Sequence, residues 1–280
     1  MTRTAVSAPG EAGPERSAAR TWQGSRVPAQ ILVLTARSMR ALLLDPRLLL
    51  VSLLSPVFML LVFSQVFSSM AATPSFPDGV GYVQFLMPAI LVNWSLHAGI
   101  QSGVGLAQDM RNGIVARFRS LPIWLGSVLI ARCLADMARG AQQLLAFLVI
   151  AYAVFGFPDA GGVPGALGAW LLAALVGGGV SWVFIALACW VRKPELLHGV
   201  LAVVTFPLMF ASNAFVPLEG LPWWLRTVAA LNPMTHTIDA ARGLMLGHPS
   251  LAHAVAAVGT ATLIGVAAAL LALRGFRRHP

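Results

Sequence analysis

The stretch ALGAWLLAALVGGGVSWVFIALACWV, residues 166–191, carries no charged side chain and no proline. A helix needs about 20 apolar residues to cross a hydrocarbon core of about 30 Å, and only a helix or a closed barrel satisfies its own backbone there. The apolar residues are continuous rather than alternating, which favours a helix. Of the 280 residues, 58% are hydrophobic and 10% are charged, against about 25% charged in soluble domains. The sequence therefore predicts an all-α integral membrane protein.

Six long, mainly apolar stretches follow one another along the chain. The predicted membrane-spanning helices lie near residues 48–68, 83–106, 128–155, 166–191, 197–215 and 251–273. In the third, Arg132, Asp136 and Arg139 occupy the first half. We interpret that half as interfacial and the remainder, 140–155, as the apolar core of the span.

The residues before the first span differ from the rest of the chain. Residues 1–28 are rich in Ala, Gly, Pro, Ser and Arg, which predicts a disordered cytoplasmic tail. Residues 29–44 can place leucines in lipid while Arg37 and Arg40 reach the headgroups, which predicts an amphipathic interfacial helix. The membrane domain as a whole is expected to cover residues 29–275.

The positions of the basic residues predict the orientation. Of the 19 Lys and Arg residues, Arg226 and Arg242 fall on one side of the six-span arrangement, and the other 17 fall on the side that carries both termini. Cytoplasmic loops of membrane proteins carry the excess of Lys and Arg. Both termini and loop 107–127 are therefore expected in the cytoplasm of a multi-pass membrane protein, with 216–250 outside. The net charge of +9 then reflects orientation rather than a nucleic-acid partner.

Motifs of several function classes are missing from the sequence. There is no GxxxxGK[ST] phosphate-binding loop, no HExxH and no GxSxG. Cys133 and Cys189 lack metal-ligand spacing and the six histidines are scattered, so we predict no metal site and no catalytic residue. An intramembrane enzyme would need paired catalytic groups at matching depth, and the sequence offers none. Proton-coupled carriers place ionisable groups at mid-membrane, but Asp136 lies near an interface and no Asp or Glu lies deep within the other predicted spans. A source of energy is therefore expected outside this chain.

The loop after the second span contains an amphipathic segment, DMRNGIVARFRSLP, residues 109–122. At about 100° per residue Met110, Ile114 and Phe118 share one face, and Asp109 suits the N-terminus of a short helix. A membrane-surface helix and a docking helix for a cytoplasmic partner both fit this pattern. The residues assigned to docking are Asp109, Met110, Arg111, Gly113, Ile114, Arg117, Phe118, Leu121 and Pro122.

The segment between the fifth and sixth spans is too apolar for an ordinary loop. Pro217, Pro222 and Pro233 cut it into pieces too short to cross, which predicts short re-entrant helices in the outer leaflet. Trp223 and Trp224 are typical of a headgroup boundary. An aromatic anchor and a gate over a translocation path both remain open. The residues assigned to the gate are Phe215, Pro217, Pro222, Trp223, Trp224, Asn232, Pro233, Asp239 and Arg242.

A polar stripe runs along the second span. Asn93, His97 and Gln101 recur every four residues and therefore share one helix face. Polar groups at this depth avoid lipid, so the stripe predicts a substrate path or a dimer face, with ordinary helix–helix hydrogen bonding favoured. Gly99 and Gly103 form a GxxxG pattern on nearly the same face, which predicts close helix approach.

Together these segments resemble the type-2 ATP-binding-cassette (ABC) permeases, most closely the daunorubicin-resistance membrane protein group, over residues 29–275. In that family an acidic-x-Arg-x-Gly segment ending in Ser/Thr-Pro follows the second span, and here residues 109–122 occupy that place. The family's external motifs correspond to Pro217 with Pro222, Leu225, Asn232-Pro233, and Asp239 with Arg242. Arg117, Leu121 and His236 depart from the family pattern and affect the docking contacts more than the family assignment.

The resemblance implies a half-transporter in the cell membrane of a bacterium. Two such subunits, identical or paralogous, would pair with two separate ABC ATPase subunits that use ATP-Mg, while this chain binds no cofactor. The helix at 107–121 would receive the ATP-driven movement, the helix at 29–44 would rest against the ATPase, and 216–250 would help to close the exit. The expected cargo is an exported amphipathic drug-like, antibiotic-like or lipid-like molecule. A lipid-linked glycan exporter subunit and a self-sufficient carrier or channel are the alternatives.

Overall fold

The computed structural model describes residues 46–69, 76, 79–114, 125–156, 160–191 and 194–277, together with the pairs 28–29, 32–33 and 35–36. Within these ranges the chain forms helices and no strand, which confirms the predicted all-α class. The elements are α2 (Pro46–Val66), α3 (Tyr82–Arg111), α5 (Leu125–Phe155), α6 (Gly162–Val191), α7 (Pro194–Phe210), η2 (Leu218–Gly220), α8 (Trp223–Leu231), α9 (Pro233–Met245) and α10 (Leu251–Arg277). Most of the predicted tail and of the predicted interfacial helix lies outside the described residues.

Five helices of the described chain, α2, α3, α5, α6 and α10, are long and apolar enough to cross a membrane. They correspond to the first, second, third, fourth and sixth predicted spans. The fifth corresponds to α7, which has only 17 residues. Its predicted end near residue 215 is wrong, because the helix ends at Phe210 and a bent segment follows. Asn232 donates a hydrogen bond from Nδ2 to the Ala211 carbonyl (2.8 Å), so the backbone can leave the helix early without an unsatisfied acceptor.

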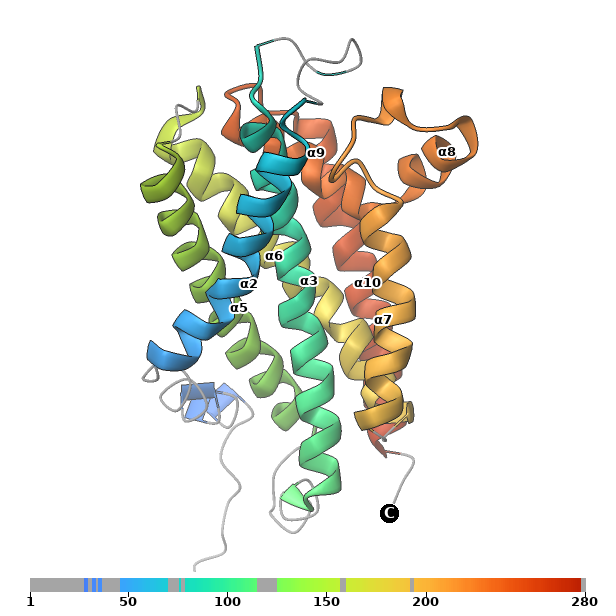
Figure 1. The fold of residues 1–280 in the computed structure, drawn as a ribbon. Helices are drawn as coiled ribbons and strands as arrows, with labels where there is room; N and C mark the ends of the chain where they lie inside the picture. Colours follow the sequence, from blue (N-terminus) through green and yellow to red (C-terminus); the bar gives the residue numbers. More distant parts are fainter. Residues whose placement is uncertain are drawn as a thin grey trace, which may run out of the picture.

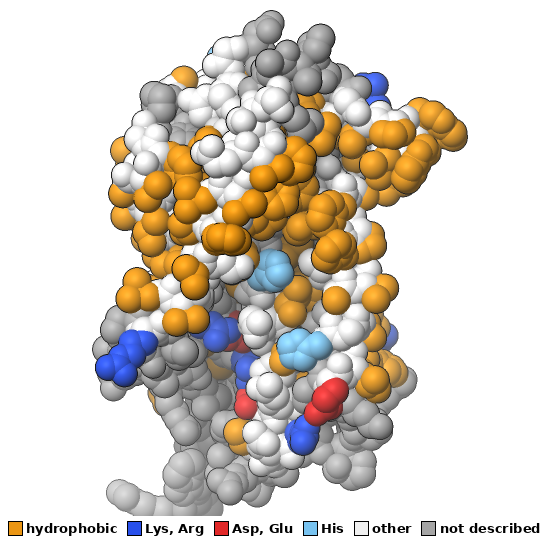
Figure 2. Space-filling view, viewed as in Figure 1, with side chains coloured by type: hydrophobic (Ala, Val, Ile, Leu, Met, Phe, Trp, Pro, Cys, Tyr) orange, Lys and Arg blue, Asp and Glu red, His pale blue; other side chains and the backbone are white. Residues whose placement is uncertain are grey.

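The long helices run back and forth between two ends of one bundle (Figure 1). We call one the α9 end, where α3 and α10 begin, and the other the Arg111 end, where α3 finishes. At the Arg111 end, Arg111 pairs with Glu195 of α7 (2.6 Å). Figure 2 shows hydrophobic side chains over much of the upper half of the face in view, and most of its charged side chains in the lower half.

Helix α6 is the centre of the bundle and packs most extensively against α3 and α10. The contact with α3 is close because of glycine: a Cβ on Gly103 would lie 2.6 Å from the Phe184 carbonyl oxygen. The contact with α10 is built in the same way, since a Cβ on Gly265 would lie 2.9 Å from the Gly179 oxygen. Small residues at such crossings allow helices to associate in lipid, and the close approach predicted from the GxxxG pattern is confirmed.

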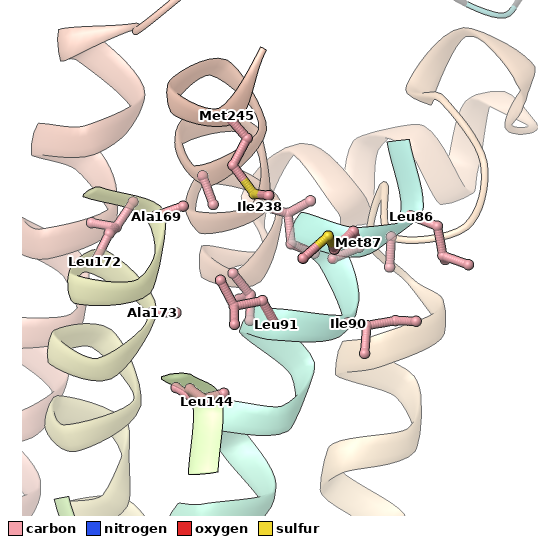
Figure 3. Close-up of a cluster of buried hydrophobic side chains, with 14 of the residues drawn as sticks. Leu86, Met87, Ile90, Leu91, Leu144, Ala169, Leu172, Ala173, Ile238 and Met245 are labelled. Atoms are coloured by element: carbon pink, nitrogen blue, oxygen red, sulfur yellow. The ribbon is translucent and has the colours of Figure 1, made fainter. Parts of the chain in front are cut away.

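The main core lies towards the α9 end, where four helices meet (Figure 3). Leu86 and Ile90 of α3, Leu144 of α5 and Ile238 of α9 are fully buried there. The short helix α9 is therefore an integral part of the packed bundle. That position brings its polar side chains against the first turns of α3.

Candidate functional site

The site at the α9 end begins with the residue that starts α9. Asn232 accepts a hydrogen bond at Oδ1 from the Met234 amide (3.0 Å), and Pro233 occupies the first helical position. An Asn cap followed by Pro is a favourable helix start, because the cap satisfies an otherwise free N–H and proline lacks one. The same Asn232 amide binds Ala211, so a single side chain starts α9 and fastens it to the end of α7.

Arg242 of α9 joins three parts of the chain. Its Nε and Nη2 donate to the Phe85 carbonyl of α3 (3.3 Å each), and Nη2 also donates to the Asn213 carbonyl (3.0 Å). Its Nη1 pairs with Asp239 one turn earlier (3.1 Å), and Asp239 in turn accepts from the Asn213 amide. We call these four residues, Phe85, Asn213, Asp239 and Arg242, the Arg242 network.

The charge of Arg242 is held in a nearly closed environment. The residue is 9% exposed, and its guanidinium carbon lies 3.7 Å from the centre of the Phe85 ring, in a cation–π contact. Burial lowers the pKa of Arg242 to about 10, while Asp239 acts in the opposite direction. The guanidinium therefore stays charged at neutral pH and keeps its partners in place.

Aromatic rings surround the bent segment next to this network. The Phe215 ring lies 5.0 Å from Phe63 of α2 and 5.4 Å from Phe210 of α7, measured between ring centres. The Tyr82 hydroxyl of α3 donates to the Phe215 carbonyl (3.3 Å). Phe215 thus links α2, α3 and α7 at the α9 end.

The nine predicted gate residues fall into two groups. The first group is buried or half-buried, includes two members of the Arg242 network, and contains Phe215, Pro217, Asn232, Pro233, Asp239 and Arg242. The second lies in or next to α8, where Pro222 precedes the helix and Trp223 and Trp224 are 82% and 56% exposed. Sequence reasoning missed Phe85 and Asn213, which reach the network from distant parts of the chain. A gating role for either group stays a prediction.

The docking segment does not begin with a new helix. Asp109, Met110 and Arg111 form the last turn of α3, and the C-cap residue Asn112 is followed by Gly113 at a φ of 70°. The predicted helix start at Asp109 is wrong, because no helix breaker separates that residue from the second span. Residues 115–124, with Arg117, Phe118, Leu121 and Pro122, lie outside the described residues, and the docking role of the segment stays a prediction.

Near the Arg111 end, the charged half of α5 packs against α3. Asp136 is 6% exposed, accepts from the Ser102 hydroxyl (2.5 Å) and pairs with Arg139 (3.0 Å) and Arg132 (3.5 Å). Arg132 also pairs with Asp109 in the last turn of α3. The interfacial interpretation of this half missed these helix–helix contacts. Their signal was the i, i+4, i+7 spacing of Arg132, Asp136 and Arg139, which places all three on one face.

A small cavity of about 20 Å³ adjoins Asp136, between α3, α5 and α6. Ser95 and Ser181 line it together with glycines of α3, α5 and α6. Its size is close to that of one water molecule, so it is too small for a transported molecule in this conformation.

The predicted polar stripe is divided by the fold. Asn93 is buried, and neither its amide nitrogen nor its amide oxygen has a hydrogen-bond partner among the described residues. His97, whose ring lies 4.9 Å from Trp94, and Gln101 are exposed. The stripe predicts hydrogen bonds between helices, and within the described chain Asn93 makes none with its side chain.

An all-helical bundle with five helices able to cross a membrane, and polar networks at both of its ends, defines a multi-pass membrane protein. Residues 29–246 match the family described as ABC-2 type transporter, and the chain belongs to that family. It is 34% identical over 212 residues to the daunorubicin resistance ABC transporter permease protein DrrB1 of Streptomyces coeruleorubidus, covering 75% of this chain and 73% of the relative. It is 26% identical over 252 residues to the probable doxorubicin resistance ABC transporter permease protein DrrC of Mycobacterium tuberculosis, covering 89% of each.

Shorter or weaker similarities extend to other permeases. The putative transport permease ycf38 of Porphyra purpurea is 27% identical over 197 residues, covering 70% of this chain and 67% of the relative. Nodulation protein J of Rhizobium leguminosarum bv. trifolii is 43% identical over 47 residues, 17% of this chain and 18% of the relative. Membership of the family implies partnership with an ABC ATPase.

Proposed function

We propose that this chain is the membrane subunit of an ATP-driven exporter, and that a separate subunit binds ATP-Mg and hydrolyses ATP. The family supports this role. The sequence agrees, since it contains no GxxxxGK[ST] loop and so lacks the usual cradle for nucleotide phosphates. In this proposal the chain binds no cofactor of its own.

The observation that carries the proposal is the continuity of α3. This helix of 30 residues places Phe85 beneath Arg242 at the α9 end and ends beside Gly113, in the loop that resembles the family's docking segment. A displacement of that loop would therefore act directly on the helix that holds α9. One continuous helix, with Pro88 inside it, joins the proposed docking site to the proposed gate, and in this proposal movement of the ATPase reaches the α9 end through it.

The bundle supports six crossings, which would place both termini on the same side of the membrane; we propose from the excess of Lys and Arg that this side is the cytoplasm. Helix α7 is short, yet its Glu195 pairs with Arg111 at one end and its last turn is followed by Ala211, bound by Asn232, at the other. It therefore extends between the two ends of the bundle (Figure 1). In this proposal the α9 end faces outward in a cell membrane.

Cysteine labelling in intact cells tests this orientation. With Cys133 and Cys189 replaced by Ala, a cysteine introduced by His248→Cys, at an exposed position between α9 and α10, is expected to react with a membrane-impermeant maleimide. One introduced by Asn112→Cys is expected to react only after the cells are broken. The reverse pattern, or reaction of both in intact cells, would contradict six crossings with cytoplasmic termini.

The names of the relatives support an amphipathic, drug-like cargo, because two of them are described by resistance to daunorubicin or doxorubicin. We propose two permease subunits with two ATPase subunits. A lipid-linked glycan or another lipid-like cargo is the alternative within this class.

Co-purification tests the partnership. The tagged full chain is expected to bring down an ABC ATPase from its own cells in mild detergent, with measurable ATP hydrolysis. The variant Gly113→Val with Phe118→Asp is expected to lose that ATPase, because valine is strained at a φ of 70° and aspartate removes an apolar side chain from the docking face.

Gly156→Val is the matched control. Gly156 also has a positive φ (57°), and nothing lies within 4 Å of a Cβ added there, but it follows α5 at the α9 end. This control is expected to keep the ATPase at the wild-type level. Loss of the ATPase from both variants, or from neither, would contradict docking at the Arg111 end. Absence of any ATPase from the intact protein would favour a self-sufficient carrier.

A further inference from the structure

Two complementary polar faces meet where α3 and α5 approach the loop that joins them. Ser102, Gly105 and Asp109 lie on one face of α3, because their spacings of three and four residues match the helical repeat. Arg132 of α5 crosses this face. A Cβ on Gly105 would overlap its Nη2, so glycine leaves the room that the guanidinium needs to reach Asp109.

The contacts of this network divide unevenly between the two helices. From α3 to α5 run the Asp109–Arg132 ion pair and the hydrogen bond that Ser102 donates to Asp136 (2.5 Å). The other two ion pairs lie within α5, where Asp136 pairs with Arg132 (3.5 Å) and with Arg139 (3.0 Å). A separation of α3 from α5 would therefore break one ion pair and one hydrogen bond of the network and leave two ion pairs intact.

This division allows α3 to move away without leaving a charge buried and unpaired. Such a charge is costly in a protein interior. The Asp136 side chain, only 8% exposed, would keep both arginines of α5 as partners. The Asp109 side chain is already 32% exposed in the last turn of α3, where water can take the place of Arg132. The interface is thus built to release at its α3 side.

The contact between the same two helices is tighter further towards the α9 end. A Cβ on Gly140 would lie 3.0 Å from the Cβ of Ala98, and we call this close approach the α3–α5 crossing. Beyond it, Ile90 of α3 and Leu144 of α5 belong to the buried core. The cavity of about 20 Å³ touches both residues of the crossing and Asp136, so packing is incomplete between the crossing and the ion pairs.

We propose that the Asp109–Arg132 ion pair is a releasable latch, and that α3 and α5 separate at the Arg111 end by pivoting about the α3–α5 crossing. In the open state Arg132 keeps Asp136, and Asp109 is solvated. Residues 112–124 join the two helices, so a force on this loop acts on the latch. The latch is a property of this chain, and only its control by an ATPase rests on the proposed function.

Distances between spin labels test the latch in the chain alone. With Cys133 and Cys189 replaced by Ala, the full chain is labelled at Gln108→Cys on α3 and Leu134→Cys on α5, both exposed positions, and placed in lipid nanodiscs. Singly labelled samples identify any distance between two copies. Pulsed electron paramagnetic resonance is expected to show a short, closed population and a longer, open one. A single distance that no variant changes would overturn the latch.

Variants of the latch give the expected direction. Asp109→Asn is expected to raise the open population several-fold, because it removes the charge that binds Arg132, and Asp109→Glu is expected to stay near the wild type. Gly105→Ala is expected to open the latch without removing a charge, because its Cβ displaces the guanidinium.

Arg111→Gln is the matched control, since it breaks the ion pair with Glu195 of α7 from the same turn of α3. It is expected to leave both populations unchanged. An equal response to Arg111→Gln and Asp109→Asn would overturn the assignment of the latch to the Asp109–Arg132 pair.

The same labels in the complex with the co-purified ATPase test control of the latch. Trapping the ATPase with ATP and orthovanadate is expected to raise the open population, and the rise is expected to be absent in the Gly113→Val, Phe118→Asp variant. If both populations exist in the chain alone but trapping leaves them unchanged, control by the ATPase is overturned. A single population in the chain alone overturns the latch itself, so the two failures are distinguishable.

Discussion

Arg242 shows how one residue can decide the structure of one end of a membrane protein. It binds two carbonyl groups and a carboxylate, and it covers an aromatic ring, while remaining almost fully buried. Two of its partners, Phe85 and Asn213, precede it by 157 and 29 positions. No local sequence pattern predicts contacts between residues so far apart in the chain. The sequence therefore singles out Asp239 and Arg242 through the family resemblance, but it does not predict the partners that they bind.

Arg242→Met is expected to lower the free energy of unfolding by about 3 kcal/mol, because it removes a buried charge and leaves its carboxylate and carbonyl partners unpaired. Arg242→Lys keeps the charge but cannot reach all three partners at once, so an intermediate loss is expected. Thermal unfolding of the purified protein in detergent measures both.

Arg274→Met serves as the control for these variants. Arg274 is exposed on α10, away from the Arg242 network, and its loss is expected to change the free energy of unfolding by no more than about 0.5 kcal/mol. If Arg242→Met were no more damaging than Arg274→Met, the network would not be what fastens α9 to the bundle.

At the scale of whole elements, helix–helix contacts depend on glycine. Gly103→Ala is expected to destabilise the protein by about 1–3 kcal/mol, because the new Cβ would meet the Phe184 carbonyl oxygen at 2.6 Å and must push α3 and α6 apart. Gly199→Ala is the matched change on α7, where nothing lies within 4 Å of the added Cβ. It is expected to be neutral or stabilising by up to about 1 kcal/mol, because alanine favours the helix. Equal unfolding temperatures for the two variants would contradict the close α3–α6 contact.

The sequence predicts the elements well where composition alone decides them. The span predicted near 251–273 appears as Leu251–Arg277, because a long charge-free run has no other stable state in lipid. The sequence does not predict the bounds or the packing of an element where these depend on tertiary contacts. α7 stops at Phe210 because side chains around α9 bind the carbonyls that follow, and the charged start of α5 is packed because α3 supplies Ser102 and Asp109.

At the scale of the whole molecule, α3 and α6 form the frame that connects the two ends. The Arg111 end contains the Asp109–Arg132–Asp136 ion pairs, and the α9 end contains the Arg242 network. Both networks are anchored on α3, so a movement imposed at one end is expected to reach the other without large changes in the core between them. The cavity beside Asp136, of about 20 Å³, has room for about one water molecule.

Transport in inside-out vesicles tests the central claim most directly. Vesicles that contain this chain and its co-purified ATPase are expected to accumulate daunorubicin only when ATP and Mg²⁺ are added. The uptake is measured by the quenching of daunorubicin fluorescence. The Gly113→Val, Phe118→Asp variant is expected to show none of this uptake. Uptake that persists without ATP or without the ATPase would contradict an externally powered permease and identify a self-sufficient carrier. A complex that hydrolyses ATP without any uptake would contradict the drug-like cargo.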